Sequence, residues 1–574
     1  MNSMGDLSVQ DLSVSYTQQD GASLAAVQRI SFSLPAGTSI GIVGESGSGK
    51  STLARALMGY TRNGARIDEG FVMLGRQKIV PSQARHRRFA RLRMAYVPQN
   101  PLSSLTPHMK VGEQVCEAVQ VSQDLDAQQA RAAALELLAA TGLPNPAVLY
   151  GRYPHQLSGG QRQRVVIAAA MATRPEVLIL DEPTTALDKT TERQVLDLLQ
   201  GLQKRFNTSL VYVSHDLHVV SSVCDQILVM RQGQLVEQGD TAAVFAQPRQ
   251  AYTRQLLEAM PTVRAKPAAS WRLPSTLSQP ALQSSPLLEL HDVSFRYPQS
   301  RSWKFWEQPP IEHVKPVLEY IGLTLNKGET LGLVGESGSG KSTIAALVAG
   351  LHTSYGGRLR FEGKALPAAA SQRTREQRRR IQIIFQDALS SLNPRHKVAD
   401  ILMRPLQLFF GMDHACAYAR ILELAQALQL DPELLERYPR QLSGGQQQRV
   451  AIARAFAAQP DLVICDEITS ALDTSIQAQV LRNLRELQRS TGTTILFISH
   501  DLGVVQHMAQ NVMVLHQGRV QACGPTEEIF QNPPNDYTRL LIEAASSTSM
   551  HAATEPCTTP YSGCRSYEFA EQSS

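Results

Sequence analysis

One nine-residue segment occurs twice in this 574-residue chain: GESGSGKST stands at 44–52 and again at 335–343. Each copy follows an apolar run and precedes a helix-like run, which is the setting expected of a phosphate-binding loop. Glycines let backbone N–H groups approach a phosphate closely, and the helix that follows adds its positive N-terminal end. The chain is therefore expected to contain two phosphate-binding domains of one kind.

The repetition extends well beyond this loop. Each half also has a glutamine, an LSGGQ segment, an acid pair and a histidine, at Gln99 and Gln386, 157–161 and 442–446, 181–182 and 466–467, and His215 and His500. From LSGGQ onward equivalent residues lie a constant 285 positions apart, whereas the loop lysines are 291 apart. A period of this kind indicates a duplicated domain, with insertions mostly in the first part of the second copy.

Composition is that of ordinary globular domains, with 43% hydrophobic residues, 19% charged residues and a net charge of +5. No run of 18 or more apolar residues occurs, so no membrane span is expected. The N-terminal segment MNSMGDLSVQ does not resemble a secretory signal. Seven scattered cysteines suit a reducing cytosol.

The expected organisation is a first domain at 5–260, a linker at 261–286 rich in Pro, Ser and Ala, a second domain at 287–545 and a flexible tail at 546–574. Within each half, apolar β-branched runs such as SIGIVG and VLILDE alternate with helical patterns. Such alternation predicts an α/β domain with helices packed on a buried, twisted parallel sheet.

The repeated residues suit the hydrolysis of a nucleoside triphosphate. Lys50 supplies a cation for the β- and γ-phosphates, and the Ser51 hydroxyl is a ligand for Mg²⁺. Asp181, at the end of VLILDE, can hold the same Mg²⁺, and Glu182 can polarise the attacking water as a general base. The same roles fall to Lys341, Ser342, Asp466 and Glu467.

Two uncharged or weakly basic side chains complete each set. His215 ends an apolar run in YVSHDL, 33 residues after Glu182, and His500 stands at the same distance from Glu467. This repetition favours contact with the γ-phosphate over a structural histidine. Gln99 and Gln386 can both donate and accept, which suits a switch that touches Mg²⁺ and the attacking water.

LSGGQ opens a helical run in both halves, and a Ser-Gly-Gly turn at a helix start is a second anion site. Two anion sites in one domain make sense if the second one grips the nucleotide held by the other domain.

Together these motifs resemble the ATP-binding cassette (ABC) family across both halves. The resemblance implies two tandem ABC-type P-loop NTPase domains, each with a RecA-like core and a helical subdomain. Finer features, such as YPHQLSGGQRQR at 153–164 and YPRQLSGGQQQR at 438–449, resemble the importers of dipeptides, oligopeptides, nickel and glutathione. That branch ends each half with HPYTxxLL, and here QAYTRQLL at 250–257 and NDYTRLLI at 535–542 keep Tyr-Thr but lack His-Pro.

The family resemblance also implies a complete site. Tyr16 and Tyr297, each expected in a strand, would stack on adenine. The implied catalytic residues are Glu182, Glu467, His215 and His500. The implied Mg²⁺ ligands are Ser51, Gln99, Asp181, Ser342, Gln386 and Asp466. The implied ATP contacts are Tyr16, Gly44, Glu45, Ser46, Gly47, Ser48, Gly49, Lys50, Ser51, Thr52, Gln99, Ser158, Gly159 and Gly160 in the first half, with Tyr297, Gly335, Glu336, Ser337, Gly338, Ser339, Gly340, Lys341, Ser342, Thr343, Gln386, Ser443, Gly444 and Gly445 in the second.

The implied function is that of an ATP-hydrolysing subunit of a peptide-type importer, at the cytoplasmic face of the bacterial inner membrane. Its partners would be two permease subunits and a solute-binding protein, with docking surfaces at 100–108 and 387–395 and no nucleic acid. The two halves would pair head to tail. Ser443, Gly444 and Gly445 would then cap the ATP on Lys50, and Ser158, Gly159 and Gly160 would cap the ATP on Lys341. Both sites keep the glutamate and are expected to hydrolyse ATP.

Three alternatives remain open. A twin-cassette ATPase that acts on ribosomes has similar architecture, although its linker is long, helical and charged. The basic clusters at 85–93 and 373–380 are either solvated helix faces or nucleic-acid patches. The aromatic insertion at 299–310, with Trp303 and Trp306, is either a surface hairpin or a contact for a partner or lipid.

Overall fold

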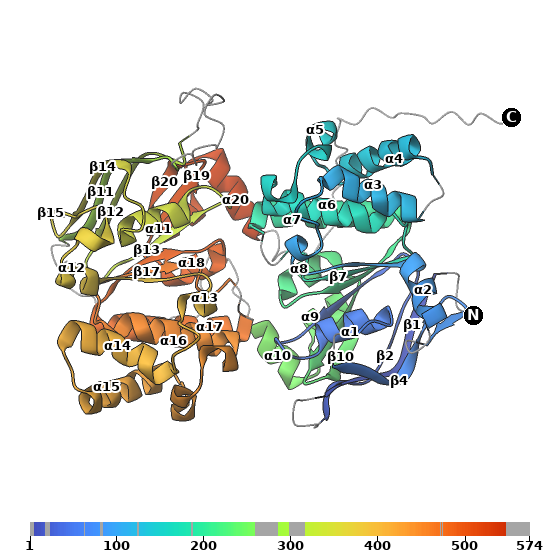
Figure 1. Cartoon of the computed structure of the whole chain (residues 1–574), viewed down its shortest axis with the longest axis horizontal. Coiled ribbons are helices and arrows are strands. Elements are labelled where there is room, and N and C mark those ends of the chain that lie inside the picture. The colour runs from blue at the N-terminus through green and yellow to red at the C-terminus, as the bar shows by residue number, and fades with distance from the viewer. Residues whose placement is uncertain are drawn as a thin grey trace.

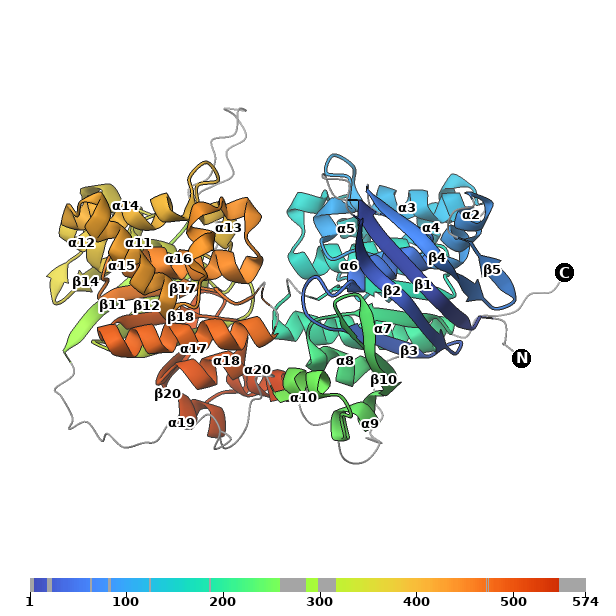
Figure 2. The same cartoon turned by 90° about the horizontal axis from the view of Figure 1, so that it is seen from below.

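The structure is a computed structural model of the chain. It describes residues 5–17, 23–61, 64–80, 84–122, 125–184, 187–258, 285–297, 316–470, 472 and 474–546. The predicted linker up to residue 284, the aromatic insertion at 299–310 and the tail beyond residue 546 lie outside the described residues, and the predicted domain boundaries stay predictions. The two halves lie side by side (Figures 1 and 2).

A six-stranded sheet forms the centre of each half. In the first half the strand order is β10-β9-β3-β8-β7-β6. The bounds are β3 (Ser39–Val43), β6 (Met94–Val97), β7 (Val177–Asp181), β8 (Ser209–Val213), β9 (Gln226–Arg231) and β10 (Gln234–Asp240). All neighbours pair in parallel except β9 and β10. The continuous apolar runs predicted to be buried strands therefore do form a largely parallel sheet.

The second half repeats this sheet in the order β16-β17-β18-β13-β19-β20. The bounds are β13 (Thr330–Gly335), β16 (Ile381–Ile384), β17 (Leu462–Asp466), β18 (Thr494–Ile498), β19 (Asn511–His516) and β20 (Arg519–Pro525). Because the carboxyl ends of parallel strands meet at one edge, the loops after β13, β17 and β18 come together there.

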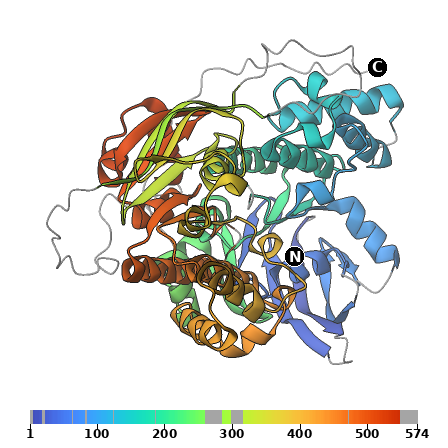
Figure 3. The same cartoon turned by 60° about the vertical axis from the view of Figure 1, so that its left-hand side comes forward.

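Each half also has a four-stranded antiparallel sheet that the sequence analysis did not predict. The first contains β1 (Leu7–Thr17), β2 (Ser23–Leu34), β4 (Ala65–Leu74) and β5 (Gln77–Ile79), and the second contains β11 (Pro286–Phe295), β12 (Leu318–Asn326), β14 (Tyr355–Phe361) and β15 (Lys364–Ala365). Its buried face joins the core that covers one side of the central sheet. In the second half β12 lies beside β20, as Figure 3 shows with that half turned forward.

A helical subdomain precedes and includes each LSGGQ helix. It consists of α3 (Val111–Ser122), α4 (Ala127–Ala140), α5 (Pro146–Tyr150) and α6 (Gly159–Met171) in the first half, and of α13 (Ala388–Ser391), α14 (Val398–Phe410), α15 (His414–Ala427) and α16 (Gly444–Ala457) in the second. Buried Val165, Ile167 and Ala168 of α6 connect this subdomain to the core beneath the sheet. The predicted helical runs after LSGGQ are thereby confirmed.

The remaining helices surround the central sheets. They are α1 (Lys50–Leu57), α2 (Ala84–Arg93), α7 (Lys189–Phe206), α8 (Leu217–Val223), α9 (Thr241–Ala246) and α10 (Ala251–Glu258), with α11 (Lys341–Ala349), α12 (Arg375–Arg380), α17 (Thr474–Thr491), α18 (Leu502–Met508), α19 (Thr526–Gln531) and α20 (Asp536–Ser546) as their counterparts. Helix α20 of the second half packs against α7 of the first (Figure 1). Among the described residues, no helix combines the length and the apolar character needed to span a membrane.

Two sequence expectations differ from the structure. Strand β11 ends at Phe295, so Tyr297 lies two residues beyond the strand in which it was expected, whereas Tyr16 lies inside β1. The second basic cluster is not simply a solvated face. Arg373 is 4% exposed, and its guanidinium donates to the carbonyl oxygens of Val348 and Pro367.

Candidate functional site

The two phosphate loops leave no room for a side chain at their first glycine. Gly44 has φ +148°, and a Cβ there would lie 2.1 Å from the carbonyl oxygen of Met230 on β9. Gly335 has φ +149°, with the Leu515 carbonyl oxygen at 2.1 Å. Both loops therefore run against the neighbouring strand, which explains why glycine is required where the sheet passes into the loop.

The loop lysines are held by the backbone of their own loop. Lys50 Nζ donates to the carbonyl oxygens of Gly44 and Glu45, both at 2.7 Å. Lys341 Nζ donates to the equivalent oxygens of Gly335 and Glu336 at 2.8 and 2.7 Å. Each ammonium group is thus placed inside the concave side of a glycine-rich loop, where it can meet a phosphate.

A glutamine, a glutamate and a histidine converge at the carboxyl edge of the first sheet. Gln99 Nε2 donates to Glu182 Oε2 at 2.7 Å, and His215 Nδ1 lies 3.3 Å from Glu182 Oε1. These residues follow β6, β7 and β8 respectively, so three neighbouring strands deliver them to one point. The sequence analysis predicted all three as parts of one site, and the structure brings them together.

The second half repeats this cluster. Gln386 Nε2 donates to Glu467 Oε2 at 2.9 Å, and His500 Nδ1 lies 3.5 Å from the same oxygen. Burial acts to raise the pKa of Glu467. The hydrogen bond from His500, the charge of His500 and the charge of Lys341 outweigh burial, so the pKa of Glu467 is lowered overall. Glu467 is therefore held as a carboxylate, the form that accepts a proton from water.

Both glutamates have a left-handed backbone. Glu182 has φ +51° and Glu467 has φ +48°. The backbone N–H of Glu182 donates to the carbonyl oxygen of Val213 at 2.9 Å, and that of Glu467 donates to the carbonyl oxygen of Ile498 at 3.0 Å. Each bond extends the pairing with the neighbouring strand by one residue. For a non-glycine residue this conformation is uncommon, and it ends the strand just before the residue whose carboxylate contacts the glutamine and the histidine.

Oxygen ligands of the kind that Mg²⁺ prefers stand next to each loop lysine. Ser51 Oγ donates to Asp181 Oδ1 at 2.7 Å, and Ser342 Oγ donates to Asp466 Oδ1 at 3.0 Å. A hydroxyl beside a carboxylate suits a hard cation that keeps several waters, so these residues fit Mg²⁺. Burial raises the pKa of Asp466, and the nearby Glu467 adds to this while Ser342 opposes it.

Some predicted contacts are only partly brought together. The hydroxyls of Tyr16 and Thr52 lie 3.3 Å apart, as do those of Tyr297 and Thr343, so each tyrosine reaches the end of its phosphate loop. Gln99 and Gln386 contact the glutamates, and their predicted role as Mg²⁺ ligands stays a prediction.

The LSGGQ serines are helix caps. Ser158 Oγ accepts from Gln161 N at 3.3 Å at the start of α6, and Ser443 Oγ accepts from Gln446 N at 3.4 Å at the start of α16. The Gln161 and Gln446 side chains return the bond to the serine N–H, which makes a capping box in each half. The predicted grip of Ser158 and Ser443 on the nucleotide of the opposite half stays a prediction.

Sequence reasoning missed the contact between the Tyr-Thr motif and the phosphate loop. Tyr252 Oη accepts from the backbone N–H of Glu45 at 3.3 Å, and Tyr537 Oη accepts from that of Glu336 at 3.4 Å. The Arg231 guanidinium lies 4.7 Å from the Tyr252 ring, and the His516 ring lies 4.0 Å from that of Tyr537. The repeated Tyr-Thr was the available signal, but its partner lies about 200 residues away in the chain and no local pattern predicts such a contact.

Removing either tyrosine hydroxyl tests whether it supports the loop. We expect Tyr252→Phe and Tyr537→Phe each to weaken nucleotide binding at its own loop by about threefold to tenfold, since a net hydrogen bond contributes about 1 kcal/mol. Equilibrium binding of a fluorescent ATP analogue measures this. Tyr320→Phe, at a residue that is 78% exposed, is the matched control. Unchanged affinity in both variants would contradict the expectation.

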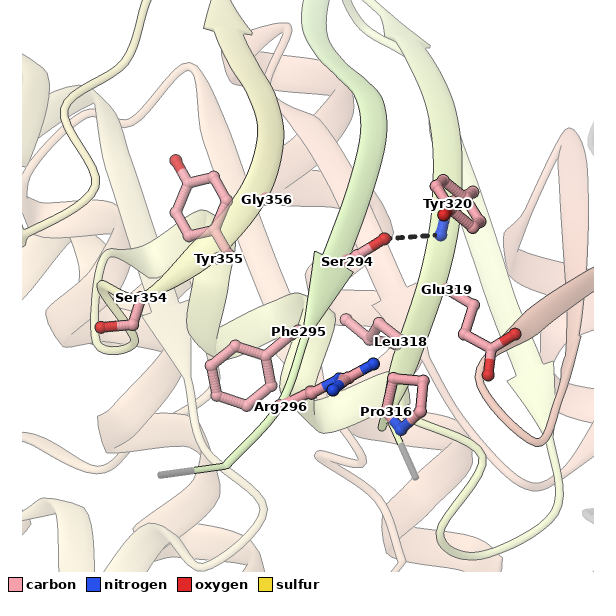
Figure 4. Close-up of a pocket in the computed structure, with 10 residues that line it drawn as sticks. All are labelled: Ser294, Phe295, Arg296, Pro316, Leu318, Glu319, Tyr320, Ser354, Tyr355 and Gly356. Atoms are coloured by element: carbon pink, nitrogen blue, oxygen red, sulfur yellow. Dashed lines mark hydrogen bonds between the residues drawn. The ribbon is translucent and has the colours of Figure 1, made fainter. Parts of the chain in front are cut away.

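A cavity of about 730 Å³ opens on the second antiparallel sheet. Its lining includes Phe295, Arg296 and Tyr320, from the end of β11 and from β12 (Figure 4). The Ser294 hydroxyl in its wall accepts from Tyr320 N at 3.0 Å. The lining includes none of the phosphate-loop or strand-end residues above, although the ring of Phe295 in its wall lies 5.0 Å from that of Tyr297, centroid to centroid.

Comparisons with known proteins agree with this geometry. The family described as ABC transporter matches residues 27–185 and 318–470. A second family, described as oligopeptide/dipeptide transporter, C-terminal region, matches residues 236–283 and 523–567, which include the Tyr-Thr motifs of both halves.

Two curated relatives match almost the whole chain. The glutathione import ATP-binding protein GsiA of Escherichia coli O157:H7 is 39% identical over 94% of this chain and 89% of its own length. The protein of the same name from Shigella sonnei has the same identity and coverage. A solved structure of cbiO1 from Clostridium perfringens, part of the ABC transporter complex cbiONQ, is 29% identical over 42% of this chain and 90% of its own, with a TM-score of 0.37.

Proposed function

This chain belongs to the ABC transporter family, and on that premise we propose that it powers the import of glutathione or a closely related small peptide through separate permease subunits. The premise covers both halves, and the importer relatives match 94% of the chain. ATP hydrolysis coupled to import is the activity of this class of ATPase. We propose, beyond this, the identity of the cargo, the permease and receptor partners, and a location at the cytoplasmic face of the inner membrane.

The observation that supports a two-site ATPase is the repeated cluster of glutamine, glutamate and histidine. Glu182 is in contact with Gln99 and His215, and Glu467 is in contact with Gln386 and His500. In each half the glutamate accepts a proton from the attacking water, while the glutamine and histidine orient that carboxylate. The loop lysine binds the phosphates, and bound Mg²⁺ would neutralise their charge from the side of Ser51 or Ser342.

Contacts between the halves support the head-to-tail pairing. Burial lowers the pKa of Lys341, and Glu467 of its own half and Asp188 of the first half oppose that lowering. Asp188 caps the start of α7, the helix on which α20 packs. The charge of Asp188, between β7 and α7 of the first half, thus acts on the phosphate-loop lysine of the second half, which supports the pairing. The equivalent Asp473 lies outside the described residues.

The segments after Gln99 and Gln386 are the proposed docking surface for the permeases. Leu102 lies in a short 3-10 helix, Pro101–Ser103, and is 48% exposed. Leu389 lies in α13 and is 39% exposed. Exposed leucines close in the chain to Gln99 and Gln386 would let a permease helix sense the state of each site.

Reconstitution tests the cargo and the partners together. When the protein is reconstituted in vesicles with its permeases and its solute receptor, we expect ATP-dependent uptake of labelled glutathione. Adding receptor loaded with glutathione should also make phosphate release faster. Leu102→Glu and Leu389→Glu serve as controls that lose this stimulation but keep basal hydrolysis. Uptake of a nickel chelate, without uptake of glutathione or a small peptide, would contradict the cargo. Co-sedimentation with ribosomes, without any association with permeases, would favour the twin-cassette alternative.

A further inference from the structure

The two carboxylates expected to face Mg²⁺ have different surroundings. In the first half, Asp181 Oδ2 accepts from the hydroxyl of Tyr96 at 2.5 Å and lies 3.5 Å from Nη2 of Arg55. Its other oxygen, Oδ1, accepts from Ser51 at 2.7 Å. Asp181 is 1% exposed, so these donors act on a carboxylate that water barely reaches. Both of its oxygens are thus engaged by the protein.

The second half lacks both extra donors. Strand pairing places Ile383 opposite Ile464 just as it places Tyr96 opposite Ile179, so Ile383 occupies the position of Tyr96. Ala346, five residues after Lys341, occupies the position of Arg55, five residues after Lys50. Neither side chain can donate a hydrogen bond. Among the described residues, Ser342 is the side chain that donates to Asp466.

The tyrosine and the arginine form one unit in the first half. Arg55 lies on α1 and Tyr96 on β6, and the Arg55 guanidinium carbon is 5.9 Å from the Tyr96 ring centroid. A cation and a hydroxyl on the same carboxylate oxygen offset part of its negative charge and fix its orientation. A metal ion beside Ser51 and Oδ1 of Asp181 therefore meets a carboxylate whose negative charge is already partly offset at Oδ2, whereas Asp466 has no such donors among the described residues.

We propose that Arg55 and Tyr96 are positioning residues that weaken Mg²⁺ binding at the first nucleotide site, so that the two sites of one chain fill with metal in order, the second before the first. The inference rests on the proposed ATP sites and adds an inequality between them. At limiting Mg²⁺ the chain has one loaded site, and at saturating Mg²⁺ it has two.

Metal titration of the full-length protein tests this. Lys341→Ala leaves the first site to be observed alone, and Lys50→Ala leaves the second. Each protein is saturated with a non-hydrolysable ATP analogue and titrated with Mn²⁺, a paramagnetic stand-in for Mg²⁺, and bound metal is read by electron paramagnetic resonance. We expect the first site to need about fivefold more Mn²⁺ than the second. A ratio of this size is what one partly exposed ion pair contributes.

Substitutions that convert the first site into the second provide the matched variants. In the Lys341→Ala background, Arg55→Ala with Tyr96→Ile should lower the Mn²⁺ midpoint toward that of the second site. Tyr96→Phe keeps the ring and removes only the hydroxyl, and it should lower the midpoint by a smaller factor. Arg55→Lys keeps a cation and should retain most of the wild-type midpoint.

The outcomes separate this inference from the proposed function. Binding of the analogue without metal is measured first, and failure of both sites to bind would contradict the ATP sites themselves. If the analogue binds but the two midpoints coincide, or if Tyr96→Phe and the double variant leave the first midpoint unchanged, the inequality is overturned. A merely structural tyrosine would lower the thermal unfolding temperature of the metal-free protein without moving the midpoint.

Discussion

Phosphate release by the Glu182→Gln and Glu467→Gln variants should show two working sites. At saturating Mg²⁺ we expect each single variant to lose the turnover of its own site, and the double variant to be slower than the wild type by about 10²–10⁴-fold, because the amide cannot accept a proton from water. Glutamine preserves the volume of the side chain, so nucleotide binding should remain. Phosphate release in steady state and in a single turnover measures both effects.

The controls for these variants lie in the same clusters. Binding of the ATP analogue must match that of the wild type, since the phosphate loops are unaltered. A single variant that releases phosphate at the wild-type rate would mean that one of the two glutamates is not a catalytic base, although its contacts with glutamine and histidine are the same in both halves.

Blocking the two LSGGQ turns should have a comparable effect without touching either phosphate loop. We expect Ser158→Arg combined with Ser443→Arg to slow hydrolysis by about hundredfold or more, because the arginine would occupy the place where the turn meets the γ-phosphate of the opposite half. ATP binding to each half should persist, since the residues that bind ATP first lie in the other domain. Steady-state phosphate release and analogue binding measure the two effects.

Ser158→Thr and Ser443→Thr are the matched controls for that experiment. Threonine keeps a hydroxyl that can cap the helix, so it retains the bonds that Ser158 and Ser443 make with Gln161 N and Gln446 N. If the arginine variants hydrolyse ATP at the wild-type rate, neither pocket needs the other half, and the head-to-tail pairing is wrong.

The central sheet and the strand-end residues were predictable because their signals are local. Each phosphate loop, acid pair and histidine follows a short apolar run, and parallel strands bring their carboxyl ends to one edge whatever the rest of the chain does. The constant spacing between the halves then assigned Glu467 and His500 once Glu182 and His215 were recognised. The clusters around the two glutamates follow directly from that arrangement.

Other features depended on contacts distant in the chain. Strand β1 alternates buried and exposed residues in the manner of a half-buried strand, but nothing in the sequence states which sheet it joins. Arg373 belongs to a run of basic residues, and only the fold shows that carbonyl oxygens of α11 surround it. Tyr96 and Arg55 carry a different kind of signal, namely that their equivalents in the second half, Ile383 and Ala346, break the repeat.

The left-handed turn at Glu182 and Glu467 bears on how much stability this chain gives up for its activity. Such a backbone costs an ordinary residue about 1 kcal/mol or more, and glycine would adopt it freely. Because the residue at this turn must also carry the proton-accepting carboxylate, glycine cannot take its place without loss of that group. The fold bears this penalty at both proton-accepting positions, so glycine at Glu182 or Glu467 would be expected to relieve the strain and to abolish hydrolysis at that site.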